Sequence, residues 1–226
     1  MKTLVALPCM DHVHTAFMES LLKLQPVGEC EFGITCSSLI YDARNTLTKK
    51  AIDGKFDRIL WLDSDMVFAP SLMRNLSADL DEGREFVSAL YFTRRPPTAP
   101  VIFKNTGYQQ VGRELTPFAE KYMDYPKNSV FEVKAVGLGA AMMTTRLVKQ
   151  IYAEYGQPFT PQPGFGEDLS FCIKCEQSGV PIWCDSRIKV GHIGQLVVTE
   201  DTYLGGVADD KQRHPCDAEM QSAVNR

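Results

Sequence analysis

The sequence predicts an α/β protein whose largely parallel sheet is flanked by helices and carries a smaller antiparallel addition. Up to Tyr91, short apolar runs of strand length alternate with helical patterns, which is the order of βαβ units. After Tyr91 the pattern changes, because the run from Arg94 to Pro97 cannot continue regular structure and a polar stretch follows it. With 226 residues, 44% of them hydrophobic, the chain is long enough to bury a sizeable core in one large domain.

The elements before residue 91 follow from apolar spacing and from the glycines and prolines between them. Apolar residues three and four apart indicate helices, and short apolar runs bounded by turn residues indicate strands. We expect strands over residues 3–7, 31–36, 59–62 and 86–91, and helices near 17–24, 42–54 and 70–82. The first strand is expected to end in a loop that begins at Pro8.

The elements after residue 91 are more irregular. We expect strands over 101–103 and 130–136 around a polar excursion from 105 to 127, then a strand over 136–143 in which Gly137 and Gly139 indicate a bulge or a close backbone approach. A helix over 145–155, a loop over 158–166, a helix ending at Gly179, and strands over 181–184 and 188–194 complete a predicted domain of residues 1–194. Residues 195–226 are expected to form a C-terminal tail or lid.

Composition and charge argue against several classes of protein. The net charge is −4 and no block of five like charges occurs, so electrostatic binding of double-stranded nucleic acid is not expected. The apolar run before Pro8 is too short for a signal peptide or a membrane span, which favours a soluble, cytoplasmic protein without stable membrane insertion. Seven cysteines fit reduced thiols better than a disulfide framework, and Cys172 and Cys175 are expected to be buried on one helix face.

Two aspartates are the strongest candidate functional residues. The apolar run over 59–62 delivers Asp63 and Asp65 at its C-terminal end, where open α/β sheets place their chemistry. If the chain is still extended there, both side chains point to the same side. Two adjacent carboxylates repel each other, so a divalent cation or a protonated acid would explain them. The alternative is that one of them merely caps the next helix.

Two further clusters stand at the ends of predicted elements. Glu167 and Asp168 fall in the first turn of a helix, where the macrodipole by itself favours carboxylates. His192 alone is most simply a hydrogen-bonded core histidine. Together with the aspartates, however, these residues indicate a metal site. A carboxylate and an imidazole suit Mn²⁺ or a similar ion, whereas Mg²⁺ would prefer oxygen ligands alone.

In this order, the motifs resemble those of the GT-A-fold glycosyltransferases. The motifs are Asp63-x-Asp65 after a strand, a Gly-rich apolar strand, Gly166-Glu167-Asp168 opening a helix, and Gly191-His192-x-Gly194. The forms Ala43-Arg44-Asn45 and Ala89-Leu90-Tyr91-Phe92-x-Arg94-x-Pro96 are similar to small glycosyltransferase-like proteins of bacteria and their phages. The resemblance covers residues 3–194 and implies a GT-A-type, Rossmann-like mixed sheet and transfer of a sugar from a nucleotide diphosphate, with a uridine diphosphate sugar favoured.

The resemblance also implies where the donor nucleotide binds. Asp65 and His192 would ligate Mn²⁺ or Mg²⁺, and Asp63 would contact the ribose or reach the metal through water. Arg44 either donates to the diphosphate or only pairs with Asp42 or Asp11, and both interpretations stay open. The residues expected to contact the donor are Pro8, Cys9 and Met10 at the nucleobase, together with Arg44, Asp63, Ser64 and Gly139.

Glu167 and Asp168 match the acidic pair that faces the acceptor in these enzymes. If the enzyme inverts configuration, Asp168 is expected to take the proton from the acceptor hydroxyl. A helix N-terminus lowers the pKa of a carboxyl group, so this base would be ionised but weak and would depend on positioning. If the enzyme retains configuration, the assignment fails and residues 137–140 are the surface beside the donor sugar. The acceptor, whether a glycan, a modified nucleobase, a protein or a lipid, and the oligomeric state are not readable from the sequence.

Three other functions fit the sequence less well. In a haloacid-dehalogenase-like phosphatase, Asp63 would be the nucleophile. That family's motif usually follows the first strand, however, whereas these aspartates follow the third predicted strand, and His192 would have no role. A nucleotidyltransferase would need a Gly-rich basic loop after the first strand, which the sequence lacks there. A non-catalytic nucleotide-binding module would be expected to have lost Asp65, His192 or the acidic pair, and all are present.

Overall fold

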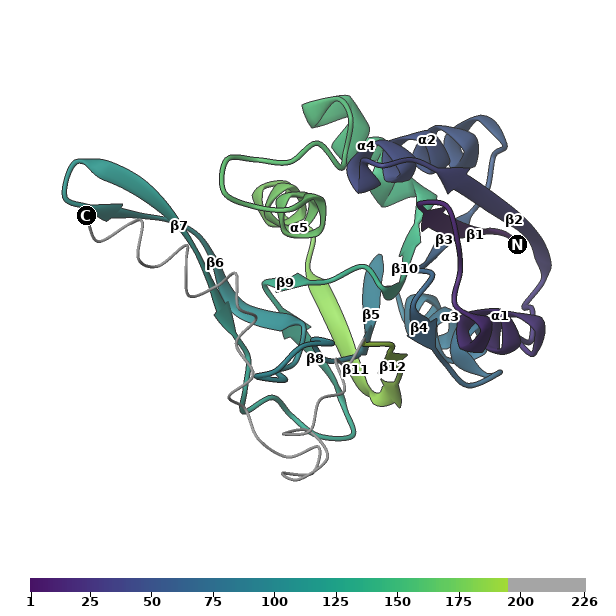
Figure 1. Ribbon diagram of the computed structural model, residues 1–226. Coiled ribbons are helices and arrows are strands. Elements are labelled where there is room, and N and C mark those ends of the chain that lie inside the picture. The colour runs from purple at the N-terminus through teal and green to yellow at the C-terminus, as the bar shows by residue number, and fades with distance from the viewer. Residues whose placement is uncertain (195–226) are drawn as a thin grey trace, which may run out of the picture.

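A seven-stranded mixed sheet forms the centre of the computed structural model, which describes residues 1–194 (Figure 1). In spatial order its strands are β2 (Glu29–Cys36), β1 (Lys2–Cys9), β3 (Arg58–Leu62), β10 (Ala140–Thr144), β5 (Phe86–Leu90), β11 (Ile182–Lys189) and β8 (Val130–Val133). β1 is parallel to β2 and β3, and β5 is parallel to β11. β10 and β8 run antiparallel to their neighbours, so the mixed sheet that the resemblance implied is confirmed. The largely parallel sheet predicted from the alternation of strands and helices is wrong, because β10 lies antiparallel between β3 and β5.

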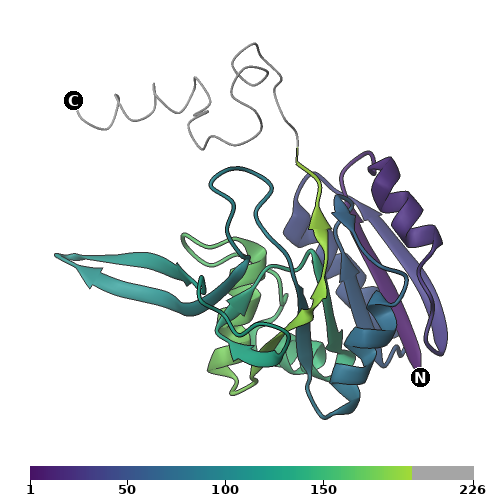
Figure 2. The same cartoon turned by 90° about the horizontal axis from the view of Figure 1, so that it is seen from below.

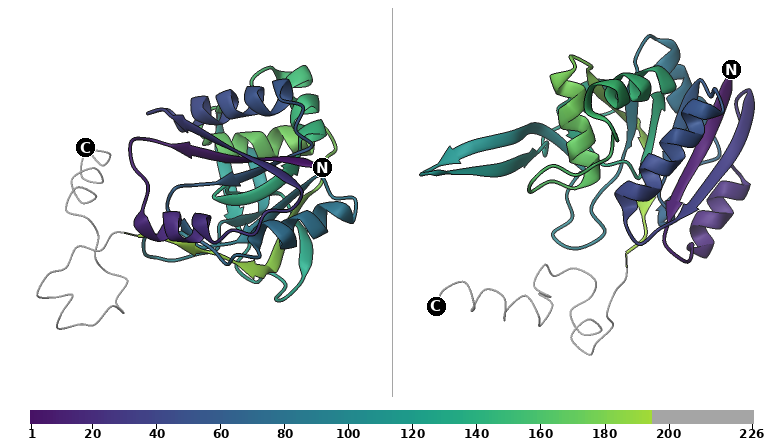
Figure 3. Two further views of the ribbon diagram at one scale, coloured as in Figure 1. Left: turned by 90° about the vertical axis from the view of Figure 1, so that its right-hand side faces the viewer. Right: turned by 90° about the horizontal axis from the view of Figure 1, so that it is seen from above.

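Helices cover both faces of this sheet (Figure 3). The helices α2 (Ile40–Asp53), α4 (Thr145–Tyr155) and α5 (Glu167–Gln177) pack on one face, and α1 (Thr15–Leu22) and α3 (Leu72–Asp81) pack on the other. The alternation of side chains along β3 shows how the layers are joined. Ile59 and Trp61 belong to the core under α2, α4 and α5, whereas Leu60 and Leu62 belong to the core under α1 and α3.

The helices lie close to where the sequence predicts them. The helix expected over residues 145–155 is α4, and Thr144 caps it by accepting a hydrogen bond from Leu147 N at 3.1 Å. α2 begins at Ile40, slightly before the predicted start, and its C-cap is Gly54. Cys172 and Cys175 are fully buried in α5, as expected for small hydrophobic side chains.

The predicted polar excursion from 105 to 127 is instead mostly a β-hairpin that projects from the body of the molecule (Figure 2). β6 (Ile102–Val111) and β7 (Glu114–Lys121) pair antiparallel across a two-residue loop in which Gly112 has a φ of +63°. Most side chains of this ribbon are exposed or half-buried on both faces, so no apolar alternation marks its strands in the sequence. With β9 (Ala135–Val136), the hairpin forms the predicted antiparallel addition.

Several strand boundaries also differ from the prediction. β1 continues through Pro8 to Cys9, because beyond Ala6 it pairs only with β2 and a residue without an N–H is tolerated there. β11 is one strand where two were expected, and the chain then forms the short β12 (Gly191–His192). β8 joins the main sheet rather than the antiparallel addition. The predicted tail or lid over 195–226 lies outside the described residues.

Candidate functional site

The candidate site begins where β3 ends. The chain leaves the strand at Leu62 and turns, with Met66 N donating to Asp63 O at 3.2 Å. Asp63 N also donates to Gly139 O at 3.0 Å, which holds the turn against the segment before β10. An extended chain would have placed Asp63 and Asp65 on the same side. Because the chain turns instead, each carboxylate has its own partners.

A small two-stranded sheet brings His192 to Asp65. β4 (Met66–Val67) pairs antiparallel with β12, so the residue after Asp65 lies opposite His192. His192 Nε2 lies 3.4 Å from Asp65 Oδ2, and His192 Nδ1 lies 2.9 Å from Phe92 O. A carbonyl oxygen can only accept, so Nδ1 carries the proton, and this bond orients the ring with Nε2 toward the carboxylate.

Arg94 is the third group at Asp65. Its Nη1 pairs with Asp65 Oδ2, the same oxygen that faces His192. Partial burial acts to raise the pKa of Asp65, but the hydrogen bond to His192 and the charges of His192 and Arg94 outweigh it and hold that pKa below its usual value. The hydrogen bond to Asp65 in turn raises the pKa of His192 against the effect of its partial burial. The surroundings of Asp65 therefore favour an ionised carboxylate facing positive charge.

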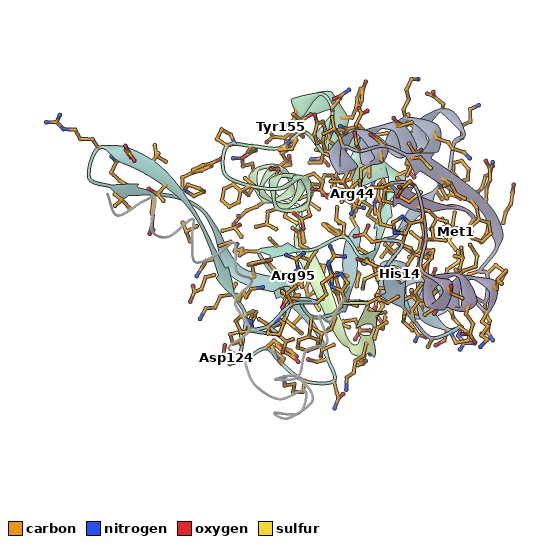
Figure 4. The ribbon with its side chains drawn as sticks, viewed as in Figure 1. Met1, His14, Arg44, Arg95, Asp124 and Tyr155 are labelled. Atoms are coloured by element: carbon orange, nitrogen blue, oxygen red, sulfur yellow. The ribbon has the colours of Figure 1, made fainter. Side chains whose placement is uncertain are left out.

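Asp63 faces a different arginine. Arg44 Nη2 lies 2.8 Å from Asp63 Oδ1, and Arg44 Nε lies 3.2 Å from Glu167 Oε1. The Arg44 side chain is 2% exposed, packs over the ring of Trp61 at 5.5 Å, and lies between α2 and α5 (Figure 4). Burial raises the pKa of Asp63, and the adjacent guanidinium opposes that effect. Arg44 thus joins two of the predicted acidic clusters, and its partners are neither Asp42 nor Asp11.

Asp168 lies in the first turn of α5, as predicted, but its acidity differs from the expectation. Its Oδ1 accepts a hydrogen bond from Leu169 N at 2.7 Å. Burial, together with the negative charge of Glu167, raises the pKa of Asp168 to about 6. The expected lowering of this pKa by the helix N-terminus is therefore wrong, because loss of solvent and a neighbouring carboxylate outweigh the helix dipole.

The glycines before β10 allow Tyr91 to approach the backbone. Gly139 N donates to Tyr91 Oη at 3.2 Å, and a Cβ on Gly137 would lie 1.9 Å from that hydroxyl oxygen. A Cβ on Gly139 would lie 3.0 Å from Met66 Sδ. The predicted close approach of backbone is thus confirmed, with Tyr91 as its partner. The Tyr91 ring in turn meets His192 edge-on with the ring centroids 5.6 Å apart, so Tyr91 packs against the histidine that faces Asp65.

The residues expected at the nucleobase lie at the C-terminal end of β1. Cys9 is buried and its Sγ lies 3.6 Å from Cys36 Sγ, whereas Met10 is exposed. Ser64 O accepts a hydrogen bond from His14 N at 3.3 Å, which ties the loop after β1 to the turn that contains the aspartates. Pro8, Cys9, Met10 and Ser64 therefore border the same edge of the sheet as the acidic residues, and their contact with a nucleotide stays a prediction.

The donor set at Asp65 fits a divalent cation that is bound together with a substrate. Within residues 1–194, no three His, Cys, Asp or Glu side chains lie together in a way that could hold a metal ion. Asp65 and His192 nevertheless offer a carboxylate oxygen and an imidazole nitrogen that already face each other. Magnesium and similar ions are commonly held by one or two carboxylates plus water and substrate phosphates. Asp65 supplies one such carboxylate, whereas the imidazole of His192 suits Mn²⁺ better than Mg²⁺.

Comparisons with known proteins identify the fold. No protein-family model matches the chain, and no curated protein sequence matches it significantly. Among solved structures, A197 from STIV has a TM-score of 0.59 at 18% identity, covering 86% of this chain and 87% of that one. The structure of GalNAc-T7 with UDP, GalNAc and Mn²⁺ has a TM-score of 0.54 at 14% identity, covering 86% of this chain and 44% of that one.

The chain has a GT-A-like fold. It spans less than half of the GalNAc-T7 chain that it resembles. In the described part of this chain, none of the helices has the length and apolar character needed to cross a membrane. On this fold, the sequence predicted the positions of the aspartates, the acidic pair and the histidine, but it did not predict the roles of Tyr91, Phe92 and Arg94. All three belong to the motif that follows the aspartates, which gave a resemblance but no assignment of roles.

Proposed function

We propose that this protein is a metal-dependent glycosyltransferase, which moves a sugar from a nucleotide diphosphate, with a UDP-sugar favoured, to an acceptor hydroxyl. The observation that carries the proposal is the meeting of Asp65 and His192 at 3.4 Å, at the end of β3 of a GT-A-like fold. The fold alone would support many chemistries, whereas this pair has the donor chemistry for a divalent ion.

Asp65 and His192 would hold Mn²⁺ or Mg²⁺, and Phe92 O keeps the imidazole in the orientation that this requires. When bound, the ion neutralises the negative charge that develops on the diphosphate as the glycosidic bond breaks. Asp63 has a different task. Arg44 holds one of its oxygens, yet the side chain remains 31% exposed, which leaves part of the carboxylate open to a ribose hydroxyl.

Arg44 is a positioning residue in this proposal. Its guanidinium binds Asp63 on the turn after β3 and Glu167 at the start of α5, so it fixes the donor side of the site relative to the acceptor side. Because Arg44 is 2% exposed, a direct contact with the diphosphate is not part of the proposal, although the sequence suggested one. The fixed separation of the two sides matters because a transfer reaction depends on the alignment of donor and acceptor.

Asp168 is the proposed base of an inverting reaction. As the acceptor oxygen bonds to the anomeric carbon, the bond from that carbon to the diphosphate oxygen breaks, and the hydroxyl proton passes to the Asp168 carboxylate. A pKa of about 6 leaves this carboxylate ionised at neutral pH and makes it a stronger base than an ordinary aspartate. Asp63 follows the third strand along the chain and is bound to Arg44, an arrangement that does not favour the phosphatase alternative.

Calorimetric titration with a panel of nucleoside diphosphates, with and without Mn²⁺, tests the proposal. We expect one of them, UDP in the first place, to bind only with the metal and to lose that binding in Asp65→Asn. Asp124→Asn is the matched control, because Asp124 is exposed and lies away from Arg44 (Figure 4). Binding that ignores both the metal and Asp65, or metal-dependent hydrolysis of a simple phosphate ester without nucleotide binding, would contradict the proposal.

A further inference from the structure

Arg94 occupies the position at Asp65 where positive charge is required. Its guanidinium pairs with Asp65 Oδ2, and the same oxygen lies 3.4 Å from His192 Nε2. The Asp65 side chain is 15% exposed, whereas that of Arg94 is 48% exposed. The arginine therefore covers a largely buried carboxylate from the solvent side. A divalent ion that binds Asp65 and His192 together needs the oxygen that Arg94 now holds.

The backbone of the loop that carries Arg94 is fixed by hydrogen bonds, whereas the Arg94 side chain is half-exposed. Thr93 N donates to Ala99 O at 2.9 Å, and Ala99 N donates to Thr93 Oγ1 at 3.0 Å, so residues 93–99 form a loop closed at its neck. Gly194 packs against this loop, since a Cβ there would lie 2.5 Å from Arg94 O. Removal of the guanidinium from Asp65 thus requires rotation of one half-exposed side chain and no rearrangement of the loop.

We propose that Arg94 is the resident cation of the Asp65 site, which a divalent ion displaces and which then binds the diphosphate of the donor. The proposal rests on the proposed function. A divalent ion and the Arg94 guanidinium would repel each other at the same carboxylate oxygen, so Arg94 opposes binding of the metal alone. A guanidinium released beside a bound diphosphate gains phosphate oxygens as bidentate acceptors. Arg94 therefore weakens the binding of free metal and strengthens the binding of metal with nucleotide.

The consequence is a linkage between the two ligands. Metal binding releases the arginine that nucleotide binding uses, so each ligand raises the affinity of the site for the other. In the absence of nucleotide, the carboxylate stays paired with the protein's own cation. This role makes Arg94 a further specificity-determining residue, which selects the complex of metal and nucleoside diphosphate over the metal ion alone.

The test is a measurement of Mn²⁺ binding by electron paramagnetic resonance without nucleotide, for the wild type, Arg94→Gln and Arg95→Gln. Arg95 is the matched control because it is an exposed arginine of the same loop. We expect Arg94→Gln to bind Mn²⁺ about five- to tenfold more tightly than the wild type, the scale of one ordinary hydrogen bond, and Arg95→Gln to stay within about twofold. With Mn²⁺ saturating, Arg94→Gln should bind UDP about tenfold more weakly.

The opposite signs of these two effects distinguish the proposal from a merely structural role. Equal or weaker binding of Mn²⁺ alone by Arg94→Gln overturns it, and so does unchanged affinity for UDP in a variant that binds the metal more tightly. Arg94→Lys is the second variant, since it keeps the positive charge without the planar guanidinium group, and we expect its Mn²⁺ affinity to remain near that of the wild type.

Asp65→Asn distinguishes failure of the Arg94 proposal from failure of the proposed function. If it abolishes Mn²⁺ binding while Arg94→Gln changes nothing, only the role of Arg94 fails, and if Asp65→Asn binds Mn²⁺ normally, the proposed function fails as well.

Discussion

The two aspartates of the turn after β3 lie one residue apart, and each pairs with an arginine, but the two pairs differ in their exposure to solvent. Arg44, beside Asp63, is 2% exposed and also binds Glu167. Arg94, beside Asp65, is 48% exposed and shares its carboxylate with His192. A buried arginine cannot leave its partner without becoming an uncompensated buried charge, whereas a half-exposed arginine can turn toward water. Asp63 is therefore held in a fixed ion pair, whereas Asp65 can exchange its arginine for another cation.

Asp65→Asn is expected to have the largest effect on ligand binding. The substitution removes a charged ligand from the proposed metal site while it keeps the shape of the side chain. We expect the affinity for UDP in the presence of Mn²⁺ to fall by more than about 100-fold, since even indirect partners of a metal ligand are worth 10- to 100-fold. Calorimetry checks this, with thermal unfolding as the control for folding. A loss of UDP affinity much smaller than this would mean that Asp65 does not bind the metal.

Arg44→Met should produce the largest effect on stability and sharpen the contrast with Arg94. The substitution leaves the half-buried carboxylates of Asp63 and Glu167 without their shared partner. We expect the free energy of unfolding to fall by about 3–5 kcal/mol, measured by urea denaturation. The matched change Arg94→Met removes a half-exposed arginine, which water can replace at Asp65, and should cost less than about 1 kcal/mol. Similar losses in the two variants would break the comparison.

Gly137→Ala should disturb the support of the Asp65 site without touching its ligands. The added Cβ would lie 1.9 Å from Tyr91 Oη, and the Tyr91 ring meets His192 edge-on. We expect a loss of about 1–3 kcal/mol in the free energy of unfolding and weaker Mn²⁺ binding. The double variant with Tyr91→Phe removes the clashing oxygen and should recover part of the loss. If it recovers nothing, the contact with Tyr91 is not the cause.

The smallest expected effect is the pH dependence of the reaction. Burial and Glu167 raise the pKa of Asp168 to about 6, so the base is ionised above that pH and protonated below it. We expect kcat/KM to be constant near pH 7 and to fall about tenfold for each unit below pH 6. Glu167→Gln removes the negative charge that raises this pKa, so its profile should break at a lower pH. A break at the same pH in Glu167→Gln would assign the titration to another group.

Much of the fold could be predicted from local patterns. The apolar run before Asp63, the helix over 145–155 and the opening of α5 at Glu167 were placed correctly because each has a period or a boundary that the sequence itself carries. The hairpin of β6 and β7 was not predicted, because its side chains are largely solvated on both faces and the sequence therefore shows no alternation of apolar and polar residues there. Strands of this kind are specified by pairing and turn geometry rather than by alternation.

In the candidate site, too, some features could be predicted from the sequence and others could not. Local patterns in the sequence predicted that acidic residues and a histidine stand at the ends of strands and helices, but they could not show that these residues meet in space. The folded chain shows that the turn after Leu62 directs Asp63 to Arg44 and Asp65 to His192 and Arg94. Local patterns could not predict these pairs, because each depends on distances between segments far apart in the sequence. The pKa of Asp168 was decided in the same way. A local rule about helix dipoles predicted a lower value, but burial and a neighbouring charge, which exist only in the folded chain, raised it.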